Sequence, residues 1–142
     1  FDYGLCKDLC IPNSVDLKAV LPVDLGKGDA MLIEQASARV PKPAGPETLP
    51  RLEVVTANLD GDVPGLEVEA YFAPGATNTD LFVASEEVLV PVPKALGPLK
   101  DRKRRFSVLF ATPEEAATAK GKPLSFTLIS DQGASETTRT QP

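Results

Sequence analysis

Proline constrains this chain more than any other residue type, because 14 prolines are spread along its 142 residues. A proline fixes its own φ angle and donates no backbone hydrogen bond, so it interrupts helix interiors and central strands. Long helices are therefore not expected, whereas short strands joined by proline-containing turns are. Hydrophobic residues make up 42% of the chain and charged residues 25%, which is the balance of a folded protein.

Alternation of apolar and polar residues predicts strands in most of the chain after Arg51. The clearest alternating run places four apolar side chains on one face, namely Leu66, Val68, Ala70 and Phe72. The expected strands are Leu52–Leu59, Leu66–Phe72, Asp80–Ser85, Val88–Val92, Phe106–Phe110 and Leu124–Leu128. Short strands at this regular spacing predict an all-β fold, an antiparallel β-sandwich with one or two short helices.

Two short helices and one linker are expected around these strands. Residues 29–39 predict a helix with Asp29 as its N-cap and an apolar face formed by Leu32, Ala36 and Val40. A second helix is expected to begin at the capping box Thr112–Glu115 and to stop at Gly121. Between the first helix and the sandwich, the proline cluster over residues 41–50 predicts a stiff linker.

The absence of histidine narrows the chemistry that this chain can perform. Ser-His-Asp and Cys-His catalysis are excluded, and the commonest zinc ligand is missing. Any chemistry must therefore use cysteine, carboxylate or lysine side chains. The net charge of −5 argues against nucleic acid as a partner.

Nothing in the sequence predicts a membrane span or a targeting signal. No apolar stretch approaches the roughly 20 residues that a membrane helix needs. The sequence begins with Phe1 rather than methionine. We therefore expect a processed or excised piece of a longer protein.

Cys6 and Cys10 are the only cysteines of the chain, with three residues between them. In an extended strand their Cα atoms would be about 13 Å apart, whereas a disulfide needs about 4.4–6.8 Å. A three-residue hairpin loop over residues 7–9 would place the cysteines opposite one another on adjacent strands. One helical turn would also bring them together, but Gly4 and Pro12 favour the hairpin.

A disulfide across so short a loop would contribute little to stability, because loop-closure stabilisation grows with loop length. Such a bond is suited to being opened and closed. Lys7 would favour a thiolate at Cys6 and Asp8 would oppose it, so the direction of the pKa shift stays open. The residues alone leave three interpretations: a structural disulfide, a redox-active pair, and two thiolates that hold a cuprous ion.

The stretch DYGLCKDLCIP, followed by a strand and then by ARVPKP, resembles the N-terminal periplasmic region of DsbD-type and ScsB-type thiol:disulfide interchange proteins. In this family a motif close to Y-x-x-C-x-x-x-C-x-P ends an immunoglobulin-like domain. The matching residues here are Tyr3, Cys6, Cys10 and Pro12. Asp80–Val83 is similar to the family's DLFVE, and Pro123–Ser130 to its closing strand. The resemblance covers most of the chain, and its specific motifs lie in residues 2–12.

This resemblance implies that Cys6 and Cys10 are the redox pair of a periplasmic protein-disulfide reductase. Cys10 would form the mixed disulfide with a partner, and Cys6 would resolve it. The transmembrane reductase domain of the same parent protein, or a thioredoxin-like domain, would reduce the pair. The pair would in turn reduce thioredoxin-like or disulfide isomerase proteins of the periplasm. The resemblance implies no cofactor and no metal ion.

Two departures from the family pattern bear on this interpretation. Enteric DsbD-type proteins have five residues between their cysteines, so the spacing here resembles the ScsB-like branch, which is associated with copper tolerance. The strands that precede the motif in the family are missing. Residues 1–25 are therefore expected to be a cysteine hairpin and a strand, Val15–Leu21, that end a preceding domain. The resemblance also implies that residues 26–50 are a short helix and a proline-rich linker, and that residues 51–142 are an all-β, immunoglobulin-like antiparallel β-sandwich.

Two alternatives to the redox function stay open at this point. The chain could be a non-catalytic immunoglobulin-like interaction domain with a structural disulfide, or a cuprous-ion-binding copper-tolerance module.

Among the charged features, the basic run Lys100–Arg105 predicts a solvated loop or a docking patch for an acidic partner or anionic lipid. Glu67 and Glu69 are expected on the solvent face of their strand, where a catalytic pair would need a pocket.

Overall fold

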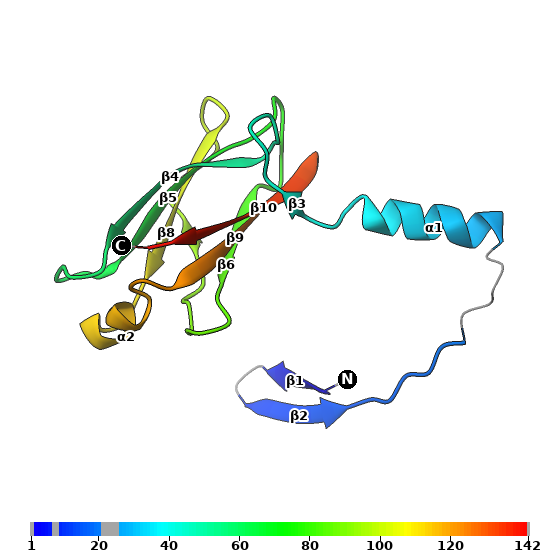
Figure 1. Ribbon diagram of the computed structural model, residues 1–142, viewed down its shortest axis with the longest axis horizontal. Coiled ribbons are helices and arrows are strands. Elements are labelled where there is room, and N and C mark those ends of the chain that lie inside the picture. The colour runs from blue at the N-terminus through cyan, green and yellow to red at the C-terminus, as the bar shows by residue number, and fades with distance from the viewer. Residues whose placement is uncertain (1, 7–8, 21–25, 142) are drawn as a thin grey trace. The chain divides into compact units, whose positions relative to one another are not determined.

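The computed structural model describes residues 2–6, 9–20 and 26–141, and the chain divides into two compact units, Phe1–Gln35 and Ala36–Pro142. In the first unit, β1 (Asp2–Cys6) and β2 (Cys10–Ser14) form a two-stranded antiparallel sheet. The helix α1 (Lys27–Ser37) follows, and the division between the units falls near its end. Figure 1 shows these elements and the labelled strands of the second unit.

The first helix is present where the sequence predicts it, but it begins two residues earlier. Ala30 N donates a hydrogen bond to Gly26 O at 3.1 Å, so the helix starts before Asp29. Asp29 therefore lies in the first turn, where its charge favours the positive end of the helix dipole, and is not the N-cap. Val40 lies beyond the last turn, so the expected apolar face ends at Ala36.

The strand expected at Val15–Leu21 is wrong for its described part. Residues 15–20 form no strand or helix, and Leu17 and Val20 are 80% and 95% exposed. An alternating segment is stable as a strand only where a neighbouring strand pairs with its backbone and a core buries its apolar face. Residues 15–20 lie outside the strands of the described sheets, and Leu21 and Pro22 lie outside the described residues.

Two four-stranded sheets build the second unit. The first has the order β4-β5-β8-β7, from β4 (Arg51–Asn58), β5 (Gly65–Tyr71), β8 (Lys103–Leu109) and β7 (Lys94–Ala95). The second has the order β3-β10-β9-β6, from β3 (Lys42–Pro43), β10 (Gly133–Thr140), β9 (Pro123–Ser130) and β6 (Asp80–Ala84). All strand pairs are antiparallel except β3 with β10.

This strand order confirms the predicted all-β sandwich. If β4 to β10 are lettered A to G in chain order, one sheet is A-B-E-D and the other contains C-F-G. That partition is the one found in immunoglobulin constant-type domains. In Figure 1 the two sheets face one another, with α2 (Pro113–Thr118) at one end of the sandwich.

Alternating apolar side chains from both sheets fill the core. The predicted inward face of β5 is confirmed, since Leu66, Val68 and Ala70 are at most 1% exposed. The opposing sheet contributes Phe126 and Leu128, each 1% exposed, from β9. Each such large side chain stabilises the fold by about 1.5–3 kcal/mol relative to an exposed position.

The second predicted helix is confirmed as α2. Thr112 is its N-cap and accepts a hydrogen bond from Glu115 N at 3.3 Å. In a standard capping box the glutamate side chain accepts a hydrogen bond from the backbone N–H of the N-cap residue. Here Glu115 Oε2 instead accepts from Ala111 N, the residue before the N-cap, at 3.2 Å. The helix ends at Thr118, and Gly121 follows with a φ of +68°, a conformation that favours glycine.

The proline stretch over residues 41–50 is part of the sandwich and is not a linker. Lys42–Pro43 pairs with β10, and Ser135 Oγ donates a hydrogen bond to the carbonyl of the buried Pro50. Proline keeps the backbone extended without donating to a ladder, which suits an edge position. The boundary expected at this stretch is therefore wrong, since the two units divide before it.

The strand expected at Val88–Val92 is also wrong. Only Lys94–Ala95 pairs with β8 in this region. Val88 and Val90 do pack against the core, which accounts for the alternation in the sequence. Pro91 and Pro93 supply no amide hydrogen, so the segment approaches the sheet without joining its ladder.

Candidate redox site

The cysteine hairpin has the register that the sequence predicts. Cys6 is the Cα partner of Cys10, and the next pairs along the strands are Leu5 with Ile11 and Gly4 with Pro12. A three-residue connection therefore joins the strands, of which Leu9 is described and is 77% exposed. Lys7 and Asp8, the two charged residues of this connection, lie outside the described residues.

Cys10 is disulfide-bonded, and no described cysteine is a free thiol. The chain's single other cysteine is Cys6, its Cα partner in the register. Directly opposed residues of an antiparallel pair have Cα atoms about 4.5–5.5 Å apart, within the range that a disulfide needs. The register of β1 and β2 thus places the two cysteine positions opposite one another.

The two faces of the hairpin differ in character because side chains alternate along each strand. Gly4 and Pro12 lie on the same face as Cys10. Glycine has no side chain and the proline ring is compact, so this face carries little bulk beside the disulfide. On the opposite face, Leu5 and Ile11 form an apolar cross-strand pair.

A hollow of about 800 Å³ lies along the hairpin and reaches Cys10. Its lining consists of Asp2, Tyr3, Gly4, Cys10, Pro12, Asn13 and Ser14. Most of these residues belong to the disulfide face, which therefore borders open space from Cys10 to the far end of the strands.

Every described side chain of β1 and β2 is exposed. Leu5 and Ile11, on the face opposite the disulfide, are 61% and 62% exposed. A single two-stranded hairpin is marginally stable in water. A link between its strands at Cys10 therefore restricts the hairpin to this register.

The basic run Lys100–Arg105 is a tight turn followed by the start of a strand. Lys100 and Lys103 exchange backbone hydrogen bonds of 2.9 and 2.8 Å, and Asp101 and Arg102 form the tip with φ of 50° and 68°. These positive φ angles are typical of the turns that join antiparallel strands. The loop prediction thus holds for residues 100–102, while residues 103–105 belong to β8.

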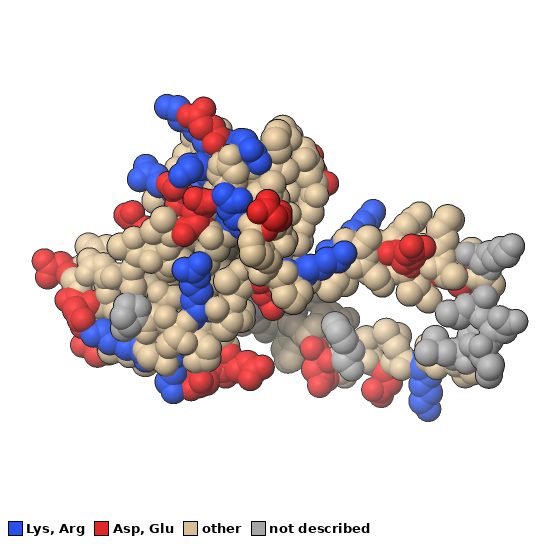
Figure 2. Space-filling view, turned by 45° about the horizontal axis from the view of Figure 1, so that its top comes forward, with Lys and Arg blue, Asp and Glu red and all other residues tan. Residues whose placement is uncertain are grey.

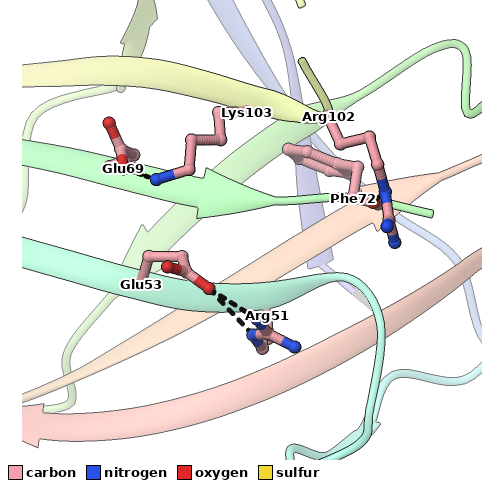
Figure 3. A network of polar contacts seen from close by, with 6 residues as sticks. All are labelled: Arg51, Glu53, Glu69, Phe72, Arg102 and Lys103. Carbon is pink, nitrogen blue, oxygen red and sulfur yellow. Dashed lines mark hydrogen bonds and ion pairs between the residues drawn. The ribbon is translucent and has the colours of Figure 1, made fainter. Parts of the chain in front are cut away.

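Several of these cations have partners within the sandwich, as Figure 3 shows. Lys103 Nζ lies 2.7 Å from Glu69 Oε1, and the hydrogen bond to this carboxylate, followed by its charge, raises the pKa of Lys103. Arg102 Nε donates to Phe72 O at 3.0 Å, and Arg51 pairs with Glu53 at 2.8 Å. Figure 2 shows basic and acidic side chains interspersed over the sandwich. We therefore assign no docking role to the basic run.

Tyr71 lies beside this charged network. The guanidinium groups of Arg51 and Arg102 lie over its ring, 4.8 and 4.3 Å from the centroid. Such cation–π contacts contribute about 0.5–1 kcal/mol at exposed sites. Glu67 is exposed and Glu69 is half-buried in its ion pair with Lys103, so the two carboxylates lie on the solvent face as expected.

The part of the chain that the structure describes contains no group of three or more histidine, cysteine or carboxylate side chains that could hold a metal ion. None of its helices has both the length and the apolar composition needed to cross a bilayer.

No protein-family model, curated protein or solved structure matches this chain.

The sequence predicts which residues approach Cys10, but not how open its face is. Gly4 and Pro12 were expected as signals of a hairpin, whereas the structure places both beside the disulfide on the same face. The signal was present, because both lie two residues from a cysteine and strand side chains alternate with a period of two. The predicted pairing of Cys6 with Cys10, extended along both strands, would have indicated this placement.

Proposed function

We propose that this chain is a periplasmic thiol:disulfide exchange module in which Cys6 and Cys10 pass electrons to an oxidised partner protein. One observation carries the proposal: the disulfide of Cys10 lies at the end of an exposed hairpin, bordered by a hollow and by residues of little bulk. Access to the sulfur is a requirement for exchange. The resemblance of residues 2–12 to DsbD-type and ScsB-type proteins supports the same function.

The proposed reaction begins with both cysteines reduced. The Cys10 thiolate attacks one sulfur of the partner's disulfide, and the partner's other sulfur leaves as a thiolate and takes up a proton. The Cys6 thiolate then attacks the Cys10 sulfur, and the partner's second sulfur leaves. Two electrons and two protons pass to the partner, and the Cys6–Cys10 disulfide forms. A dithiol domain of the parent membrane reductase restores the reduced state by the reverse exchange.

This proposal predicts opposite behaviour for the two single-cysteine variants. Cys10→Ser removes the attacking thiol, so reduction of a disulfide-bonded partner should stop. Cys6→Ser leaves the attack intact but removes the resolving thiol, so a mixed disulfide with the partner should accumulate. Non-reducing electrophoresis after acid quenching and alkylation measures both outcomes, with a thioredoxin-like protein as the partner. Full turnover by both variants would contradict the proposal.

A structural disulfide is the second candidate, and the marginal stability of a two-stranded hairpin favours it. The two candidates predict different reduction potentials for the disulfide. Structural disulfides have potentials below about −300 mV, whereas an exchangeable pair is poised closer to the glutathione couple. Equilibration of the oxidised chain with glutathione buffers of known ratio, followed by alkylation, measures this potential. A value well below about −300 mV would favour the structural candidate.

A further inference from the structure

We infer that the hollow along the hairpin seats an extended segment of the redox partner, and that Gly4 sets the access of this segment to Cys10. This inference rests on the proposed function and adds the kind of substrate that the site takes. The occupant is a polypeptide segment that carries the partner's reactive cysteine, rather than a small thiol.

The length of the hollow points to a polypeptide. Its lining begins at Cys10 and continues along β2 to Ser14, with Asp2 opposite at the start of β1. Four residues of an extended strand span about 13 Å. A segment of about this length can place its cysteine sulfur at Cys10 while its neighbouring residues occupy the rest of the hollow.

The chemistry of the lining also suits an extended backbone. Gly4 and Pro12 face one another across the strands, next to the cysteine pair and on its face. Beyond them, Asp2 and Ser14 place a carboxylate and a hydroxyl at the far end of the hollow. Compact residues near the sulfur admit a main chain, and polar side chains farther away can hydrogen-bond to its amide groups.

Gly4 controls this access because any larger side chain there would extend from the disulfide face. The position belongs to a strand, so a β-branched residue is compatible with the backbone. A valine at this position would add bulk beside Cys10 on the path of the incoming segment, and would leave the sulfur itself unchanged.

The test compares two disulfide substrates across matched variants. The first substrate is a pair of extended peptides joined through a central cysteine, and the second is the small linear compound bis(2-hydroxyethyl) disulfide. The reduced unmodified chain and the variants Gly4→Val, Gly4→Ala and Leu5→Phe react with each substrate under pseudo-first-order conditions. Leu5→Phe is the control, because it adds bulk to the opposite face of the same strand.

Gly4→Val should slow reduction of the peptide disulfide by at least about tenfold, since exchange depends on access and alignment at the sulfur. Gly4→Ala should give a smaller decrease, and Leu5→Phe should react like the unmodified chain. The rate with bis(2-hydroxyethyl) disulfide should change by less than about twofold in all variants, because a small substrate does not use the length of the hollow.

Three outcomes would overturn the inference. Gly4→Val could reduce the peptide at the unmodified rate, Leu5→Phe could slow it equally, or both substrates could slow together. Cys10→Ser, measured beside them, separates this inference from the proposed function. If Cys10→Ser is inactive while Gly4→Val is unimpaired, only the inference fails. If Cys10→Ser remains active, the proposed function fails as well.

Discussion

Asp131 couples the stability of the sandwich to pH at the scale of a single residue. Its carboxylate accepts hydrogen bonds from Thr77 N at 2.7 Å and from Thr77 Oγ1 at 2.8 Å. These bonds favour the charged form, so the backbone amide of Thr77, and then its hydroxyl, hold the pKa of Asp131 below its usual value. The stabilisation is therefore complete above the unfolded pKa of about 3.9 and is lost as the pH falls through the lower folded pKa.

The free energy of unfolding should consequently decrease as the pH is lowered below about 4. Urea denaturation followed by circular dichroism at a series of pH values between about 6 and 3 measures this dependence. Asp131→Asn should be less stable at neutral pH and should show a shallower decrease on acidification. Asp16→Asn is the control, because Asp16 lies in the first unit. An acid dependence that is unchanged in Asp131→Asn would contradict this assignment.

At the scale of the strand, alternation decides which side chains hold the sandwich together. Phe126 on β9 is 1% exposed, whereas Phe82 on the neighbouring β6 is 54% exposed. The register pairs Phe126 with Val83, the residue that follows Phe82. Two phenylalanines on adjacent strands therefore point to opposite faces of the same sheet.

Phe126→Ala should lower the free energy of unfolding by about 3–5 kcal/mol, because it removes a buried ring and leaves a cavity. Phe82→Ala is the matched control and should change stability by less than about 0.5 kcal/mol. Chemical denaturation of both variants gives the comparison. Equal losses in the two variants would show that the faces of this sheet are assigned wrongly.

The same alternation explains which strands the sequence predicts and which it does not. β5 and β9 bury one face and expose the other, so their pattern is visible in the residues. β10 has the sequence GASETTRT, with few apolar residues, and its pairing with β9 follows from the short turn before it. Residues 15–20 have the same pattern but belong to none of the described strands. Alternation in the sequence thus indicates that one face of a segment can be buried. Whether the segment pairs with another strand depends on the rest of the chain.

At the scale of the whole molecule, the candidate redox site and the hydrophobic core belong to different units. Cys10 lies in the first unit, and all the residues of the buried core lie in the second. The spacing of the cysteines is enough to predict their opposition across a hairpin, because a three-residue loop leaves few alternatives. The same register places Gly4 and Pro12 beside Cys10, so that part of the hollow could be predicted, whereas its continuation to Asp2 and Ser14 is known only from the structure.

The most direct test of the exchange function measures the Cys10 disulfide and the sandwich in the same sample. The oxidised chain is incubated with a reduced thioredoxin-like protein in native buffer, and alkylation followed by mass spectrometry reports the disulfide while circular dichroism reports the sandwich. The disulfide should equilibrate with the dithiol as the spectrum and thermal unfolding of the sandwich stay unchanged. A disulfide that is reduced only when denaturant unfolds the sandwich would contradict the account.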